Sequence, residues 1–166
     1  MAALSLQNKN LPTQAKLLES FQNTYPGITF LPGTDFAWSP KRATISYILD
    51  SAGEPVNTYA LIHEVAHADL GHNTFDDDFS LLTLEVAAWE RAKQIGVSVA
   101  VKIDEEHIQD CLDTYRDWLH SRAKCPACGV VSMQAKDGSY TCFNCKTGWK
   151  VPKSQVCRVR RTRIDK

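Results

Sequence analysis

The chain has 166 residues, enough for one domain of ordinary size or for a main domain with a small appendage. Its 19 basic and 19 acidic residues cancel, but residues 1–120 carry 8 basic and 17 acidic residues while residues 121–166 carry 11 and 2. This split indicates an acidic body and a basic C-terminal piece, and basic pieces often bind nucleic acid. No apolar run has the roughly 20 residues of a membrane helix, and the N-terminus lacks the pattern of a signal peptide. We therefore expect a cytoplasmic protein with no membrane partner.

Hydrophobic periodicity and turn residues predict an α+β fold for the first part of the chain. The expected elements are a helix, three strands and three more helices, over residues 12–25, 28–31, 35–38, 43–49, 58–70, 76–95 and 104–122. The last two strands should form a β-hairpin. We expect Asn57 or Thr58 to cap the second helix, Gly71 to end it and Gly96 to end the third. The acids at 76–78 are interpreted as helix capping and solvated charge.

Residues 61–67, LIHEVAH, contain the pattern H-E-x-x-H. On a helix, His63 and His67 lie one turn apart on one face, so both imidazoles can reach one Zn²⁺. Glu64 projects at a neighbouring angle, where it can act as general base toward a metal-activated water. The alternative is a helix with two hydrogen-bonded histidines and a surface glutamate.

A catalytic zinc needs a third protein ligand, for which the chain offers His72, Glu85 and Glu90. We favour Glu85, because a carboxylate on the next long helix can pack across the helix that carries His63 and His67. His72 would then be a second-shell residue or an oxyanion donor, and Glu90 an exposed helix charge.

The run H-E-V-A-H-A-D-L-G-H-N, followed by E-V-A-A-W-E-R-A, resembles the ImmA/IrrE-type metallopeptidases over roughly residues 15–100. The match places Glu85 at the first carboxylate of the second motif, although Ala87 stands where a second acid is frequent and Trp89 where Asn is common. The resemblance implies a minimal zincin-like fold, with helices on a small sheet. It also implies limited proteolysis of a helix-turn-helix repressor after stress or DNA damage. The cysteine-rich C-terminus resembles the peptidase of CapH/CapP-type pairs, which control antiphage operons.

Two C-x-x-C pairs, Cys125/Cys128 and Cys142/Cys145, stand 13 residues apart. Such pairs bring four thiolates around one Zn²⁺ in a closed structural site, and Asp137-Gly138 between them is a hairpin signal. The alternatives are an iron–sulfur centre or a thiol redox pair. We predict a zinc ribbon in a second domain over residues 123–166, after a peptidase domain over 1–122, and hence two zinc ions per chain.

The C-terminal piece joins aromatic and basic side chains in a pattern typical of proteins that bind single-stranded nucleic acid. The aromatic rings of this piece are those of Tyr140, Phe143 and Trp149. We expect single-stranded DNA as an activator, bound by Trp149, Lys150, Lys153, Arg158, Arg160, Arg161 and Arg163. The alternative is that the aromatics fill the core of the ribbon and the basic tail is solvated, or docks on the acidic body.

Two cysteines lie outside the pairs. Cys111 lies on the apolar face of its helix, where the plain interpretation is a buried thiol. The sharper hypothesis makes Cys111, or else Cys157, an inhibitory ligand that occupies the open position of the catalytic zinc. His107, one turn earlier, could lower the pKa of Cys111, but we favour the interpretation of His107 as a surface histidine.

The sequence thus predicts a zinc endopeptidase that cleaves a helix-turn-helix repressor. A SprT-like DNA–protein crosslink protease is the first alternative, although no His between residues 73 and 106 offers the later ligand expected of one. The second is a nucleic-acid-binding adaptor with a vestigial peptidase body.

Overall fold

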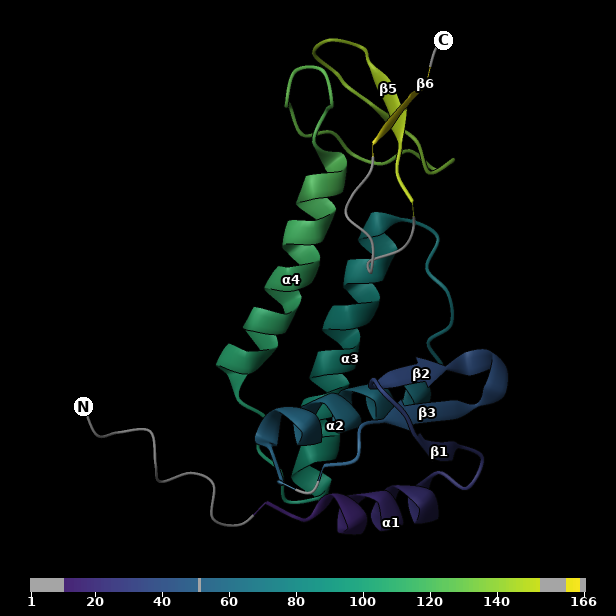
Figure 1. Cartoon of the computed structure of the whole chain (residues 1–166), viewed down its shortest axis with the longest axis vertical. Helices are drawn as coiled ribbons and strands as arrows, with labels where there is room; N and C mark the ends of the chain where they lie inside the picture. Colours follow the sequence, from purple (N-terminus) through teal and green to yellow (C-terminus); the bar gives the residue numbers. More distant parts are fainter. Residues whose placement is uncertain (1–10, 51, 153–160, 165–166) are drawn as a thin grey trace, which may run out of the picture. The chain divides into compact units, whose positions relative to one another are not determined.

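The computed structural model describes residues 11–50, 52–152 and 161–164 (Figure 1). Over these residues the chain forms four α-helices and two three-stranded sheets, which confirms the α+β class. None of the described helices combines the length and the apolar character needed to cross a membrane. The residues pack into two compact units: the described part of 1–73 with 86–105, and the described part of 74–85 with 106–166. The predicted division into domains 1–122 and 123–166 concerns which parts of the chain fold independently, and it stays a prediction.

The first unit is built on a small mixed sheet. Its elements up to residue 69 are α1 (Gln14–Thr24), β1 (Thr29–Pro32), β2 (Ala37–Ser39), the 3₁₀ turn η1 (Pro40–Arg42), β3 (Thr44–Tyr47) and α2 (Pro55–Asp69). The strand order is β1-β3-β2, with β1 parallel and β2 antiparallel to β3. The predicted hairpin is therefore confirmed, and β2 is an edge strand. Ile45 of the central strand β3 is fully buried.

Helix α2 begins earlier than predicted. Glu54 precedes it and Pro55 takes the first helical position, where the missing N–H and fixed φ of proline are favourable. The predicted caps Asn57 and Thr58 are wrong, since both lie inside the helix. The apolar face is fully buried at Leu61, Ile62, Val65 and Ala66. Gly71 follows with a φ of 65°, the left-handed conformation predicted for it.

Helix α3 (Asp78–Ser98) runs past Gly96, so the prediction that Gly96 ends it is wrong. The chain turns back just after the helix, and the backbone N–H of Val101 donates to the Gly96 carbonyl at 2.8 Å. A Cβ atom at position 96 would lie 2.6 Å from the Val101 oxygen. Gly96 is thus required for this close approach, and Ala100 takes the left-handed conformation instead, with a φ of 59°.

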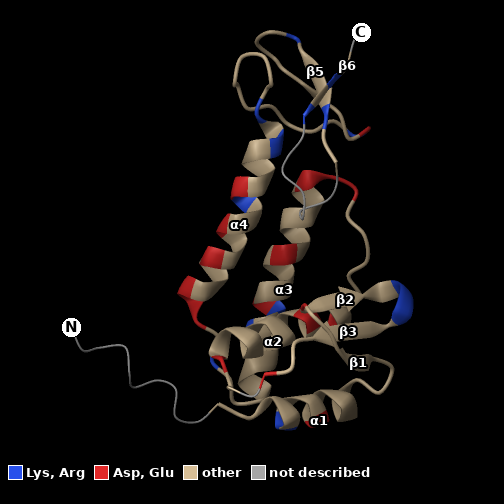
Figure 2. Ribbon diagram, in the orientation of Figure 1, with Lys and Arg blue, Asp and Glu red and all other residues tan. Residues whose placement is uncertain are grey.

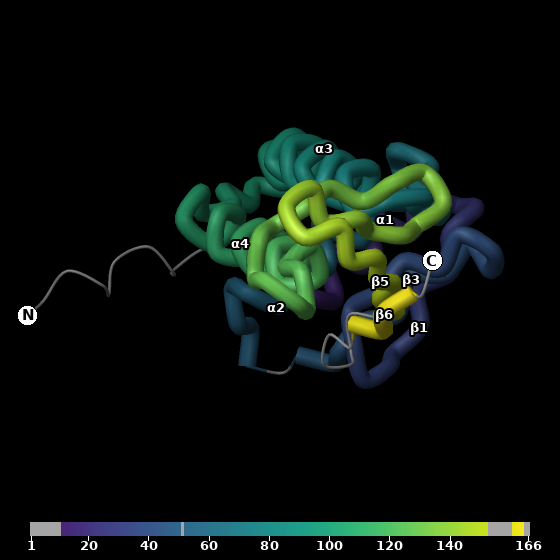
Figure 3. Tube along the Cα trace, turned by 90° about the horizontal axis from the view of Figure 1, so that it is seen from above, coloured from purple at the N-terminus to yellow at the C-terminus, as the bar shows by residue number. Residues whose placement is uncertain are grey.

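The second unit contains α4 (Glu105–Ala123), β4 (Tyr140–Thr141), β5 (Gly148–Lys150) and β6 (Thr162–Ile164). The three strands form an antiparallel sheet, in which β5 and β6 lie side by side (Figure 3). We call residues 125–150 the ribbon. Its core consists of Cys125, Tyr140, Cys142 and Trp149, with the Tyr140 and Trp149 rings stacked at 5.2 Å. Gly138 takes a φ of 78° in the turn predicted at 137–138.

Candidate metal centres

His63, His67 and Glu85 form the first metal-binding group. Each residue offers one ligand atom, and the three atoms all lie within 4.8 Å of one another. The histidines come from consecutive turns of α2, and their Nε2 atoms are 3.0 Å apart. Two imidazoles on one tetrahedral Zn²⁺ would have their nitrogens about 3.3 Å apart. This set of two nitrogens and one carboxylate is one that Zn²⁺ uses in hydrolases, so the residues fit that metal.

Of the three candidates for the third ligand, the structure brings Glu85 into the group. Glu85 is only 6 % exposed, the environment expected of a carboxylate that holds a metal rather than a solvated charge. Glu90 is exposed, and its carboxylate pairs with Lys93 at 2.6 Å. His72 also lies outside the group.

Trp89 contacts the first histidine directly. The two rings stack with centroids 4.1 Å apart, and Trp89 is 4 % exposed. A flat apolar wall of this kind limits rotation of the His63 ring and keeps water from one of its faces. In the sequence, Trp89 stands out only as a departure from the family pattern. The available signal was its spacing, because Trp89 follows Glu85 by one helical turn.

A backbone group of the sheet holds the Glu64 side chain in place. Its Oε2 accepts a hydrogen bond of 2.7 Å from the backbone N–H of Trp38, which lies in the edge strand β2. A backbone donor fixes the carboxylate without adding a competing charge. The sequence placed Glu64 on the same helix as the histidines but did not indicate which group would orient it.

His72 contacts the second histidine on the side away from His63. The Nδ1 atoms of His72 and His67 are 2.9 Å apart, while Nε2 of His67 faces His63. The indole N–H of Trp38 also donates to the backbone carbonyl of His72 at 2.9 Å. Trp38 therefore connects to both Glu64 and His72. Neighbours of this kind fix the ring orientation of a ligating histidine, so this role of His72 stays a prediction that the contact with His67 is compatible with.

We expect His72→Ala to weaken zinc binding at His63, His67 and Glu85 by about 10- to 100-fold, the usual effect of removing a hydrogen-bonding neighbour of a ligand. Competition with a chelator of known affinity measures this change. His120→Ala is the matched control, because His120 is an exposed histidine on α4. Equal zinc affinity in the two variants would show that His72 does not orient His67.

The four ribbon cysteines form the second metal-binding group. Sγ of Cys125 lies 3.6 Å from Sγ of Cys145, and Sγ of Cys128 lies 3.5 Å from Sγ of Cys142. These distances are far longer than a disulfide bond and close to the roughly 3.8 Å between thiolates on one tetrahedral Zn²⁺. All four cysteines are free. The residues therefore fit the predicted closed zinc site.

Backbone hydrogen bonds lower the pKa of Cys142, and the pKa of Cys145 is also lowered, which favours the thiolate form at these two of the four cysteines. The hydroxyl and the backbone N–H of Thr147 lower the pKa of Cys145 to about 6. In the first C-x-x-C pair, the backbone N–H of Ala127 donates to the Cys125 sulfur at 3.4 Å. A backbone N–H thus points at the Cys125 sulfur, as in the short turns that hold structural zinc.

Cys111 is partly buried, and its sulfur lies 3.5 Å from Nε2 of His107. Burial raises the pKa of Cys111, and the nearby carboxylates of Asp110 and Glu85 add to the rise. The pKa of Cys111 is thus raised, whereas a protonated His107 would lower it. Among the described residues, Cys111 is not a member of the His63, His67 and Glu85 group. Its inhibitory role stays a prediction, and Cys157 lies outside the described residues.

The residues predicted to contact nucleic acid differ in their environments. Trp149 is fully buried in the ribbon core, so its ring is not available to stack on a base. Lys150 is exposed on β5. Arg161 donates to the carbonyls of Ser121 and Lys124, and Arg163 donates to that of Pro126. Lys153, Arg158 and Arg160 lie outside the described residues. The exposed aromatic ring of the ribbon is that of Phe143, which is 67 % exposed.

The chain matches no family model, no curated protein and no solved structure.

Proposed function

We propose that the protein is a zinc-dependent endopeptidase of the ImmA/IrrE type, with a zincin-like body and a C-terminal zinc ribbon. The observation that carries this proposal is the position of Glu64. It follows directly on the first histidine of the His63, His67 and Glu85 group, and the backbone of β2 holds its carboxylate. A buried metal site with a held carboxylate beside it is the arrangement that peptide hydrolysis requires.

Zinc at this site would supply Lewis acidity toward a peptide carbonyl and would lower the pKa of a water molecule. Glu64 then accepts the proton of the attacking water and passes it to the leaving amine. The hydrogen bond from Trp38 keeps the carboxylate in place during both transfers. His72 and Trp89 keep the rings of His67 and His63 in their orientations.

The substrate proposed for this site is a helix-turn-helix transcriptional repressor, cut at a limited number of bonds. Its support is the resemblance carried by H-E-V-A-H-A-D-L-G-H-N and E-V-A-A-W-E-R-A. A further support is that His63, His67 and Glu85 lie close enough together to hold one metal ion.

Single-stranded DNA is the proposed activator. The support is the excess of 11 basic over 2 acidic residues in 121–166, part of which is visible as the Lys and Arg of the second unit in Figure 2. Phe143 takes the place of Trp149 as the aromatic ring for stacking, because it is exposed. Lys150 and Phe143 are thus the described residues proposed to contact DNA.

The test is incubation of the zinc-loaded protein with a helix-turn-helix repressor encoded beside its gene, with and without single-stranded DNA. The expected result is a small set of fragments, identified by mass spectrometry, that form faster with DNA. Digestion of several unrelated DNA-bound proteins would instead indicate a crosslink protease. Binding of one zinc per chain, lost only when the ribbon cysteines are replaced, would indicate an adaptor without catalysis.

A further inference from the structure

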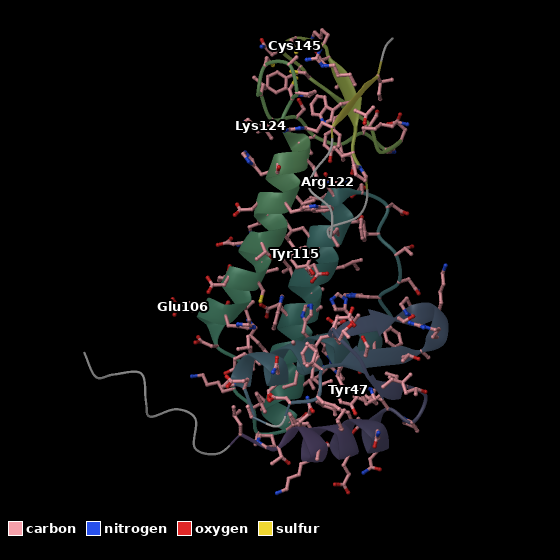
Figure 4. All side chains as sticks on the ribbon, viewed as in Figure 1. Tyr47, Glu106, Tyr115, Arg122, Lys124 and Cys145 are labelled. Carbon is pink, nitrogen blue, oxygen red and sulfur yellow. The ribbon has the colours of Figure 1, made fainter. Side chains whose placement is uncertain are left out.

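The first residue of α3, Asp78, is bound on three sides by residues of the same compact unit. Its backbone N–H donates to Oε1 of Gln134 at 2.9 Å. Its carboxylate accepts from Nε of Arg122 at 3.2 Å and from the hydroxyl of Tyr140. The side chain of Arg122, labelled in Figure 4, extends from α4 to make this contact. Asp78 is thus held by the ribbon and by the helix that leads into it.

Each of these partners is itself packed into or against the ribbon. Tyr140 stacks on Trp149 and belongs to the core that also contains Cys125 and Cys142. Burial and the Asp78 carboxylate raise the pKa of Tyr140, so its hydroxyl remains a donor at neutral pH. A core of this size depends on its metal, since so few residues bury too little apolar surface to fold alone.

Gln134 and Arg122 depend on the ribbon in the same way. The side-chain amide of Gln134 donates to the carbonyl of Gly138 in the hairpin turn at 3.2 Å. The backbone carbonyl of Arg122 accepts the indole N–H of Trp149 at 3.0 Å, and its guanidinium also donates to the Pro152 carbonyl. Loss of the ribbon fold would therefore remove the contacts of Gln134 and Tyr140 with Asp78, and it would free Arg122 from the indole of Trp149.

Helix α3 links this contact to Glu85. Asp78 and Glu85 lie seven residues apart in one continuous helix, which is two turns and about 10 Å along the axis. Seven residues return to within about 20° of the same face. The start of the helix also has its own cap, because Ser80 N–H donates to the Asp77 carboxylate at 2.7 Å and Asp77 N–H donates to Ser80 Oγ at 3.0 Å. The helix can therefore form without the ribbon, and the contacts of Asp78 hold its first turn, on the N-terminal side of Glu85.

We propose that Asp78 is a positioning residue through which the metal-loaded ribbon places Glu85, so that the ribbon metal sets the zinc affinity of the His63, His67 and Glu85 site. The ribbon is then an allosteric element as well as a structural one. This inference depends on the two metal sites and not on peptidase activity. Its failure is therefore distinguishable from failure of the proposed function.

The experiment measures zinc affinity in the full chain by competition with a chelator, with the histidine site identified by its loss in His63→Ala. We expect Asp78→Ala to weaken zinc binding at the histidine site by about 5- to 150-fold, the usual range of coupling between two separate sites. Asp76→Ala is the matched control. It removes an exposed carboxylate two residues earlier, outside the helix. A purely structural role of Asp78 in the second unit would leave the histidine site unchanged.

Two further variants keep the result interpretable if Asp78→Ala disturbs the fold. Tyr140→Phe removes only the hydroxyl and keeps the ring stack, and should weaken the histidine site in the same direction. The double variant Cys142→Ser with Cys145→Ser removes the ribbon metal and should weaken that site at least as much as Asp78→Ala. Adding Asp78→Ala to the cysteine variant should then cause no further loss. Unchanged zinc affinity in Tyr140→Phe and in the cysteine variant, with normal helical circular dichroism, would overturn the proposal.

Discussion

Glu64→Gln is expected to reduce peptide hydrolysis by about 10²- to 10⁴-fold, the range typical of removing a general base. Glutamine has the same shape and keeps an acceptor for the backbone N–H of Trp38, so the side chain should stay in position. It cannot accept a proton from water at neutral pH. The fold and the zinc at His63, His67 and Glu85 should therefore be retained.

The measurement is the rate of repressor cleavage at saturating zinc, with zinc content determined on the same samples. Glu90→Gln is the matched control, because Glu90 is a solvent-exposed glutamate paired with Lys93. This variant should cleave the repressor at the rate of the parent protein. If Glu64→Gln cleaved at the rate of Glu90→Gln while binding the same amount of zinc, Glu64 would not be the base. If it lost zinc instead, its role would be to support the metal.

Arg122→Ala is expected to lower the free energy of unfolding by about 3–5 kcal/mol, the cost of breaking a buried ion pair by removing one partner. The side chain of Arg122 is 2 % exposed and that of Asp78 is 15 % exposed, so little water screens the pair. Truncation leaves the Asp78 carboxylate without its counter-charge and removes the guanidinium that lies 4.1 Å above the Trp118 ring. It also opens a cavity in a closely packed region.

Arg116→Ala provides the comparison on the same helix. Arg116 pairs with Asp113 at 2.6 Å, but the two side chains are 44 % and 63 % exposed. An exposed pair contributes about 0–1 kcal/mol, so this variant should be close to the parent protein. Urea denaturation at saturating zinc, followed by circular dichroism, gives both values. A loss in Arg122→Ala no greater than that in Arg116→Ala would mean that solvent reaches the Arg122–Asp78 pair.

The features that sequence predicts best here are local. The histidines of H-E-x-x-H face one way because four residues make about one helical turn, and the C-x-x-C pairs converge because each is a short knuckle. The hairpin of β2 and β3 also follows from its own turn. Glu85 required a further assumption, that the third helix crosses the second, and the structure brings the three side chains together.

The features that were missed depend on tertiary contacts. The hydrogen bonds from Trp38 to Glu64 and to His72 join residues 26 and 34 positions apart, which no periodicity indicates. Gly96 looked like a helix stop, because its need for a close backbone approach depends on where Val101 returns. Trp149 looked like a stacking platform, because composition does not distinguish a buried aromatic ring from an exposed one.

The acidic run at 76–78 contains one residue with a local role, which the sequence predicts, and one with a tertiary contact, which it does not. Asp77 caps α3, as the interpretation of the run as a helix start suggested. Asp78, its neighbour, is instead bound by Arg122 and Tyr140, which lie 44 and 62 residues further along the chain. Two adjacent aspartates thus make different contacts. Asp77 caps its own helix, whereas Asp78 binds one residue of α4 and one of the ribbon.

The two hydrogen bonds of Trp38 come from different parts of the residue, which determines how position 38 would tolerate replacement. The N–H that holds Glu64 belongs to the backbone, so every amino acid with an amide hydrogen keeps it. The N–H that holds His72 belongs to the indole, so phenylalanine removes that contact alone. Only proline, which has no amide hydrogen, removes both. In a saturation screen, position 38 would therefore separate the support of the general base from the support of the metal ligand.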